Sequence, residues 1–355
     1  MNNQNQSIFE FTIEDIDREL IARGRKMSPE NQFDFKDKEG CPERDRMMQG
    51  VKELYESAAS FPVNEELRHI STPELIQLLM LKFGVSGTSN DRGVWLCDYR
   101  RDFYEITEDP IRDNACRTAA IYTKDYLPEG KSGLSSLKIK HYGDTFKLCD
   151  CEPFRDQPIA AGRLLTGFLV EEDVIATAGH VAHETEVTDL RIVFGYRMTG
   201  PMTPVIDIPN EHIYKGVKFL GRVYDRLGNG SDWALIQLDR NVKAISPVVL
   251  SEKEVYCNQP VYVIGYPVGL PLKVAPGGCV HDIADAWFTS DLDIYSGNSG
   301  SPIFDSQTHE VIGIVVRGDN RDFRWTGNGW LSVIYPNPDI HSKGAQCTKI
   351  TELRR

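Results

Sequence analysis

The part of the chain that most limits its fold begins near Val94, where short runs of β-forming residues alternate with turn residues. Glycine, proline, asparagine and aspartate separate these runs, and few stretches between them have helical periodicity. Short strands at this spacing are typical of an all-β sandwich or of a pair of barrels. The clearest runs are residues 165–170, 173–178, 190–193, 233–238, 261–264 and 311–316.

The sequence before Val94 has a different pattern, which predicts helices. Residues 12–25 carry acidic side chains at their start and basic ones at their end, as the helix dipole favours. Residues 42–59 place apolar side chains near helical spacing, and Ser71 begins a third helix with a hydroxyl cap and a proline in the first turn. We therefore expect a helical N-terminal module over residues 1–90, a linker over residues 91–112 and a β domain over residues 113–355.

Charge and cysteine content exclude several classes of partner. The 355 residues include 40 lysines and arginines against 52 aspartates and glutamates, so the formal net charge is −12. A surface this acidic repels phosphate backbones and anionic lipids, and we expect neither nucleic acid nor a membrane as partner. Eight scattered cysteines indicate reduced thiols, and the first residues lack the basic and apolar regions of a secretory signal. We expect the protein in the cytosol.

Three short segments of the β region carry the residue types that nucleophilic catalysis needs. They are residues 175–180 (IATAGH), 231–235 (SDWAL) and 297–302 (GNSGSP). A serine hydroxyl is a weak nucleophile and needs a base, and histidine suits this role because it titrates near neutral pH. A buried carboxylate then orients the imidazole and stabilises its charged form. The sequence supplies His180, Asp232 and Ser299, in that chain order, as base, orienting carboxylate and nucleophile.

Glycines around Ser299 fit a second requirement of acyl transfer. Two backbone N–H groups must converge on the oxygen that becomes negatively charged. A turn that brings them together needs backbone angles and close approaches that glycine tolerates best. We expect the N–H groups of Gly297 and Ser299 to form this oxyanion hole.

In these motifs the sequence resembles the trypsin-like serine peptidases, which have the chymotrypsin fold. The resemblance rests on Thr-Ala-Gly-His ending at His180, Asp-Trp-Ala-Leu from Asp232 and Gly-Asn-Ser-Gly-Ser-Pro around Ser299. It covers roughly residues 113–345. It implies a mainly β protein, with a chymotrypsin-like pair of six-stranded antiparallel β-barrels after the N-terminal α-helical module. The motif around Ser299 looks closer to bacterial glutamyl endopeptidases and HtrA-type proteases than to digestive enzymes.

The resemblance implies a serine endopeptidase that works through an acyl-enzyme on protein or peptide substrates, with no metal or organic cofactor. Its active site would lie between the barrels, with His180 and Asp232 from the first barrel. No cysteine flanks His180, so the disulfide of secreted members is absent there. Asn298 replaces the aspartate that pairs with a newly cut amino terminus in zymogen-activated members, so activation by that route is not expected. Val316 lies near the serine that many members bond to the catalytic aspartate, so Asp232 must find other donors.

Asp293 is the candidate for substrate selection. It lies six residues before Ser299, the offset that marks the floor of the S1 pocket in trypsin-like enzymes. A carboxylate in a poorly solvated slot favours Arg or Lys at P1 by charge pairing. Asp291 competes for this role if the loop is offset by two residues.

Residues after the nucleophile complete the expected substrate-binding wall, which consists of Val315, Val316, Arg317 and Gly318. Glutamyl-specific relatives place a histidine on this strand, where the chain has Val315. The sequence therefore favours a basic P1 residue over an acidic or small one. Arg317 would neutralise the pocket if it pointed inward.

Three alternatives accompany this interpretation. His180, His183 and Glu184 suggest a metal site, but their spacing is not His-Glu-x-x-His and further ligands are missing, so we expect no metal. The fold could instead serve as a catalytically silent binding module, although all three chemical residues are present. The enzyme could also be held latent by, or recruited through, its N-terminal helices, which makes a protein partner of residues 1–90 a further hypothesis.

Overall fold

A computed structural model gives the fold of the β region. The helices expected within residues 1–90 lie outside the residues that the structure describes. All described residues belong to one unit, formed by residues 90–335 and 342–355. The structure describes residues 94–95, 98–127, 130, 133–150, 152–162, 164–180, 186–225, 230–318, 322–325, 329–335 and 344–354.

Six antiparallel strands close into the first barrel, in the order β11–β12–β8–β7–β3–β9. Their core side chains, among them Phe168, Ile175 and Ile236, are fully buried. Aromatic and β-branched residues suit such a pleated, packed surface. The strands are β3 (Thr118–Thr123), β7 (Leu165–Glu171), β8 (Val174–Thr177), β9 (Leu190–Val193), β11 (Ile213–Tyr224) and β12 (Asp232–Leu238).

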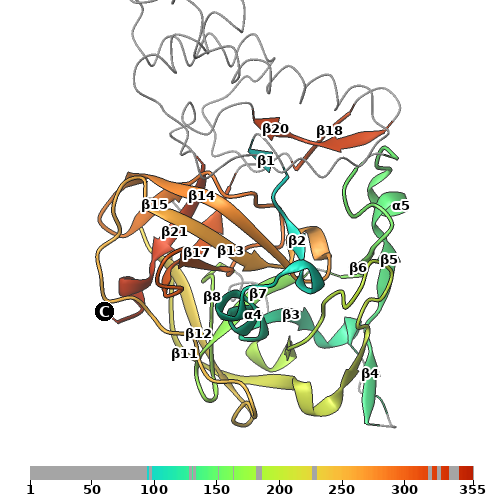
Figure 1. The fold of residues 1–355 in the computed structure, drawn as a ribbon. Helices are drawn as coiled ribbons and strands as arrows, with labels where there is room; N and C mark the ends of the chain where they lie inside the picture. Colours follow the sequence, from blue (N-terminus) through green and yellow to red (C-terminus); the bar gives the residue numbers. More distant parts are fainter. Residues whose placement is uncertain are drawn as a thin grey trace, which may run out of the picture. The chain divides into compact units, whose positions relative to one another are not determined.

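Six further antiparallel strands form the second barrel, which closes because β13 pairs with both β16 and β14. The order is β13–β16–β17–β21–β15–β14, around a core that includes Val263, Phe288 and Val315. The strands are β13 (Pro260–Gly265), β14 (Lys273–Ile283), β15 (Trp287–Ser290), β16 (Pro302–Asp305), β17 (Val311–Arg317) and β21 (Ala345–Lys349). Figure 1 shows these orange and red strands beside the green and yellow strands of the first barrel. The expected pair of six-stranded antiparallel barrels is confirmed.

Residues 98–112, part of the segment that the sequence predicts as a linker, pack against the barrels. β2 (Arg101–Asp102) pairs with β14 at the edge of the second barrel, and Arg100 and Asp102 are buried. α4 (Asp109–Cys116) has Pro110 in its first turn, where the missing N–H has no partner to lose. Buried polar side chains such as Arg100 do not produce an apolar periodicity. The sequence pattern therefore does not predict that residues 98–112 pack against the barrels.

Short elements make up the connections between the strands. No helix in the described part of the chain combines the length and apolar character that crossing a bilayer requires. The remaining strands and α-helix are β1 (Val94–Trp95), β4 (Leu134–Ser136), β5 (Ile139–His141), α5 (Tyr142–Phe146), β6 (Pro158–Ala160), β10 (Asp207–Pro209), β18 (Phe323–Trp325), β19 (Trp330–Ser332) and β20 (Ile334–Tyr335). The 3-10 helices are η3 (Phe103–Glu105), η4 (Lys124–Tyr126), η6 (Val187–Asp189), η7 (Asn210–His212), η8 (Pro267–Gly269) and η10 (Ile350–Arg354).

Candidate active site

His180 and Asp232 come from neighbouring strands of the first barrel. His180 follows the end of β8 and Asp232 begins β12, and these two strands pair directly. His180 Nδ1 lies 2.9 Å from Asp232 Oδ2, and the backbone N–H of His180 donates to Oδ1 over 2.9 Å. The Asp232 side chain is 0% exposed, whereas that of His180 is 20% exposed. An ionised carboxylate only accepts hydrogen bonds, so a neutral imidazole in this place donates from Nδ1 and keeps the lone pair on Nε2.

Ser299 lies in the turn that leads into β16, and both barrels hold this turn. The carbonyl of Ser299 accepts the N–H of Thr166, on β7, over 3.1 Å. The Thr166 hydroxyl donates to the carbonyl of Gly297 over 3.0 Å. From the other side, the N–H of Gly300 donates to the carbonyl of Val315, on β17, over 2.8 Å. Ser299 itself is partly exposed.

Gly300 allows this turn, residues 295–301, to approach β8, the strand that precedes His180. Its φ angle is +87°, and a β-carbon there would lie 2.1 Å from Thr166 O, 2.2 Å from Thr177 Oγ1 and 3.2 Å from Ala178 N. Any side chain at this position would collide with β7 and β8. The glycine therefore brings the residue after Ser299 into contact with the residues just before His180.

The peptide between Ser296 and Gly297 has a fixed orientation. The carbonyl of Ser296 accepts the N–H of Val268 over 2.5 Å. Val268 adopts a φ angle of 48°, a left-handed conformation that is strained for a β-branched residue. The C=O and N–H of a trans peptide point in opposite directions, so the N–H of Gly297 points away from Val268. The strained residue thus orients the N–H group that the sequence predicts as an oxyanion donor.

Asp232 has two further partners, both from the second barrel. Arg317 Nη2, at the end of β17, lies 3.5 Å from Asp232 Oδ2, and the same nitrogen donates to the carbonyl of Asp225. Thr348 Oγ1, on β21, accepts the backbone N–H of Asp232 over 3.0 Å and donates to its carbonyl over 3.2 Å. Arg317 and Thr348 supply contacts that a valine at position 316 cannot make.

A family model described as a trypsin-like peptidase domain matches residues 165–314. This stretch includes β7, β8, β12 and the 295–301 turn, and hence His180, Asp232 and Ser299. Over these residues the chain is similar to the trypsin-like peptidases. A search of the curated proteins returns no match to the sequence.

Solved structures similar to this chain include three proteases. A Glu endopeptidase in complex with MPD is 15% identical over 72% of this chain and 92% of its own, with a TM-score of 0.43. The VesB protease of Vibrio cholerae is 12% identical over 72% of this chain and 66% of its own, with a TM-score of 0.43. The active form of the Rv3671c protease of M. tuberculosis is 16% identical over 59% of this chain and 73% of its own, with a TM-score of 0.36.

The two candidate pocket carboxylates of this trypsin-like domain are both buried and both accept backbone N–H groups. Asp293 is 3% exposed, and its Oδ2 accepts the N–H of Tyr99 over 2.9 Å. Asp291 Oδ1 accepts the N–H of Cys279 over 2.5 Å, and its Oδ2 lies 3.2 Å from His281 Nε2. Asp291 is thus paired with an imidazole of β14, whereas Asp293 is bonded to the segment that precedes the barrels.

Of the residues expected to form the substrate-binding wall, Val315 and Val316 are buried, whereas Arg317 contacts Asp232 of the first barrel. Val315 and Val316 are both 2% exposed and point to opposite faces of β17. Val315 packs in the core of the second barrel, Val316 packs in the larger core cluster, and Gly318 directly follows the strand. The guanidinium of Arg317 contacts Asp232 and the carbonyl of Asp225.

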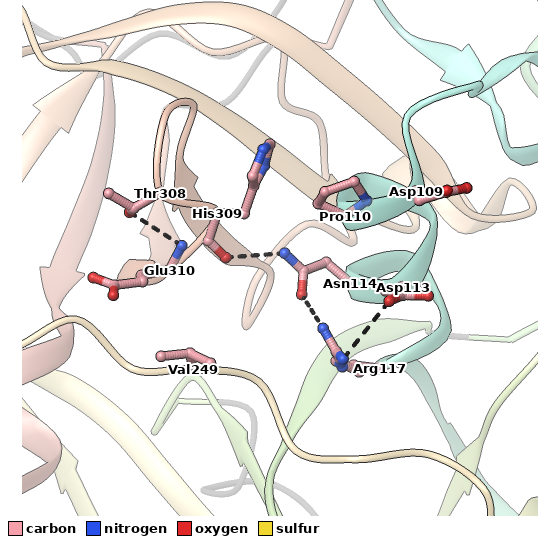
Figure 2. Close-up of a pocket in the computed structure, with 9 residues that line it drawn as sticks. All are labelled: Asp109, Pro110, Asp113, Asn114, Arg117, Val249, Thr308, His309 and Glu310. Carbon is pink, nitrogen blue, oxygen red and sulfur yellow. Dashed lines mark hydrogen bonds and ion pairs between the residues drawn. The ribbon is translucent and has the colours of Figure 1, made fainter.

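A surface pocket of about 390 Å³ lies between α4 and the turn that joins β16 to β17. Figure 2 shows Asn114 between its two partners there, donating to the carbonyl of His309 over 3.0 Å and accepting from Arg117 over 2.8 Å. These polar groups bind one another and join the helix ahead of the first barrel to the second barrel. The pocket includes none of the predicted site residues.

The structure describes only His180 of the three residues that suggested a metal site. His183 and Glu184 lie outside the part of the chain that the structure describes. Within that part, no three His, Cys, Asp or Glu side chains come together as metal ligands would.

Sequence reasoning missed two threonines of this trypsin-like site. Thr166 contacts Gly297 across 131 positions of the chain, and Thr348 contacts Asp232 across 116. A threonine in a β-strand is ordinary, and no local pattern marks one whose partner is this distant. Their polar character at fully buried positions becomes informative only once the strand pairing is known.

Proposed function

We propose that this chain is a serine endopeptidase that hydrolyses peptide bonds through an acyl-enzyme. The observation that carries the proposal is the bond between His180 Nδ1 and the fully buried Asp232, beside the turn with the partly exposed Ser299. A buried carboxylate behind an imidazole is the arrangement that lets histidine act as a general base toward serine. The trypsin-like family match supports the same function.

In the proposed mechanism, Ser299 Oγ attacks the carbonyl carbon of the scissile peptide while His180 Nε2 takes the hydroxyl proton. The N–H groups of Gly297 and Ser299 hold the oxyanion of the tetrahedral intermediate. His180 then delivers the proton to the leaving amine, the C–N bond breaks, and the acyl group stays on Ser299. A water molecule then attacks the ester while His180 takes its proton. The bond to Ser299 Oγ breaks as His180 returns that proton to Oγ, and the acyl group leaves as a carboxylic acid. Asp232 stabilises the imidazolium in both steps.

Cleavage of an unfolded protein by purified full-length chain tests this function. The variants Ser299→Ala and His180→Ala should lower kcat/KM by roughly a factor of 10⁴ or more while retaining the circular dichroism and melting temperature of the wild type. Residual cleavage by Ser299→Ala at the wild-type rate would overturn the proposal. A wild-type chain that binds peptides and cleaves none would favour the catalytically silent binding module.

A preference for Arg or Lys at P1 is part of the proposal. Asp293 supports it, because a carboxylate that is 3% exposed attracts a cation far more strongly than a solvated one does. Mass spectrometry of a diverse peptide library after digestion tests the preference. Cuts after Glu or after small residues would reject it in favour of a glutamyl or small-residue specificity.

Regulation or recruitment through residues 1–90 and a cytosolic location complete the proposal. Both rest on the sequence: a helical pattern ahead of a protease domain, and thiols scattered through a long chain. Deletion of residues 1–90 should change either the rate of hydrolysis or the proteins captured by the Ser299→Ala variant. A deletion that changes neither would remove the regulatory part and leave the endopeptidase in place.

A further inference from the structure

Arg100 is a buried cation that the proposed mechanism does not use. It is 4% exposed and lies in residues 98–102, the segment that leads the chain into the β domain. Its Nε donates to Asp98 Oδ1 over 2.8 Å and its Nη2 donates to Oδ2 over 2.7 Å. Glu152 Oε1 lies 3.9 Å from the same Nη2. A buried charge with these partners has little freedom to move.

The guanidinium of Arg100 covers the ring of Tyr295. Its Cζ lies 4.2 Å from the ring centroid, within the range of a cation–π interaction. Tyr295 is 1% exposed, and its hydroxyl donates to Ser332 Oγ over 2.7 Å. Ser332 in turn donates its N–H and its hydroxyl to Glu152, the acid beside Arg100. Both the face and the hydroxyl of the ring are therefore held by one buried network.

Tyr295 begins the turn that carries Ser299. Its carbonyl accepts the N–H of Asn298 over 3.0 Å, and the carbonyl of Asn298 accepts the N–H of Ser301 over 2.8 Å. A shift of Tyr295 would move its carbonyl oxygen, which accepts the hydrogen bond from Asn298 within the turn. Because catalysis depends on the position of reacting groups to within about an ångström, such a shift would lower the reactivity of Ser299.

The chain on both sides of Arg100 is anchored to the second barrel. The N–H of Tyr99 donates to Asp293 Oδ2 over 2.9 Å. Asp102 lies in β2, which pairs with β14, as Figure 1 shows. The Asp102 carboxylate binds Lys273 Nζ and accepts Gln157 Nε2 over 2.7 Å. These contacts fix the backbone from which the guanidinium reaches Tyr295.

We propose that Arg100 is a positioning residue for Ser299: it holds Tyr295, and through Tyr295 the 295–301 turn, in the reactive conformation. The predicted effect of Arg100 on kcat rests on the proposed function. Its effect on the conformation of the 295–301 turn does not, because that can be measured without any enzyme activity. The segment ahead of the barrels thereby becomes part of what sets the reactivity of Ser299.

The test compares Arg100→Met and Arg100→Lys with wild type. Because Arg100→Met alone leaves Asp98 buried without its cation, the double variant D98N/R100M is made alongside. Arg112→Gln is the matched control, since Arg112 also lies over a ring, that of Phe103 at 4.5 Å, and donates to the carbonyl of Ile106 over 2.8 Å. Amide hydrogen exchange of the 295–301 turn, kcat and KM of a peptide substrate, and melting temperature are measured for each.

The proposal predicts that amide exchange in the turn accelerates about tenfold or more in both methionine variants and less in Arg100→Lys. The kcat should fall roughly ten- to a hundredfold in the methionine variants with KM within about twofold of wild type. Arg112→Gln should lower the melting temperature and leave the turn and kcat unchanged. Wild-type exchange in the turn of D98N/R100M, or an equal loss in Arg112→Gln, would overturn the proposal. If the wild-type chain hydrolyses nothing, the proposed function fails and hydrogen exchange still decides the role of Arg100.

Discussion

Arg317 Nη2 lies 3.5 Å from Asp232 Oδ2, the same oxygen that lies 2.9 Å from His180 Nδ1. A guanidinium of the second barrel and an imidazole of the first barrel therefore share one carboxylate oxygen. Arg317 also donates to the carbonyl of Asp225, which directly follows β11, so its side chain crosses from one barrel to the other. A cation in this place compensates a fully buried negative charge and repels the protonated form of His180.

Replacing Arg317 with methionine should move the acid limb of the pH profile of kcat/KM to higher pH, by about half a pH unit to one unit. Without the guanidinium, the Asp232 carboxylate attracts the protonated imidazole with no cation to offset it. The profile is measured with a fluorogenic peptide between pH 5 and pH 9. The variant Arg317→Lys keeps the cation and should keep the wild-type limb. If the acid limb moves equally in both variants, or in neither, the electrostatic role assigned to Arg317 is wrong.

Thr166→Val should lower kcat roughly tenfold with little change in KM. The substitution keeps the shape of the side chain and removes the hydroxyl that donates to Gly297 O and accepts the N–H of Tyr266. Thr118→Val is the control, because its buried hydroxyl donates to Asn114 O over 3.0 Å. Each variant should lose about 1–3 kcal/mol of unfolding free energy. Equal losses of kcat in the two variants would contradict a specific role for Thr166.

Asp293→Asn should lower kcat/KM for peptides with Arg or Lys at P1 by about a hundredfold or more, because the substrate cation loses its partner in a poorly solvated slot. Asp291→Asn is the matched control, since Asp291 is already paired with His281. The measurement is kcat/KM for peptides that differ only at P1. If Asp291→Asn changes the P1 preference and Asp293→Asn does not, the pocket floor has been assigned to the wrong carboxylate.

Lys273 should contribute stability that increases as the pH rises from 8 towards 10, because burial lowers the pKa of Lys273 to about 8 although Asp102 opposes this shift. Between that value and the ordinary lysine pKa of about 10.4, the unfolded chain holds a proton that the folded chain has released. The contribution of Lys273 to the free energy of unfolding therefore increases with pH in this window. Urea unfolding of wild type and of the D102N/K273M variant measures the effect. A wild-type curve that runs parallel to that of the variant would exclude the contribution of Lys273.

Most strands could be predicted from the sequence because their apolar side chains are contiguous and bounded by turn residues. The runs at 165–170, 190–193 and 311–316 fall within β7, β9 and β17. β11 could not be predicted in this way. Lysines, an arginine and two glycines interrupt its 12 residues, and many of its side chains are exposed. Pairing with β12 and β9, rather than an apolar pattern, makes it a strand.

The sequence predicts those residues of the candidate site that lie in short, recognisable motifs. His180, Asp232 and Ser299 each lie in a short motif. Arg317 stands beside Val316 on β17, and nothing near it in the sequence indicates that it reaches Asp232. Arg100 lies in a stretch without apolar periodicity, and its contact with Tyr295 joins segments far apart in the chain. Such contacts depend on barrel closure, which a linear pattern does not encode.

The most direct measurement of the central claim is covalent labelling by a fluorophosphonate, followed by intact mass and peptide mapping. Wild type should gain one adduct on Ser299, because the probe forms a stable ester only with a serine whose proton a base removes. His180→Ala and Asp232→Asn should label at least about a hundredfold more slowly, and Ser299→Ala should not label. A wild-type chain without an adduct, or one that labels as fast when His180 is removed, would contradict the account.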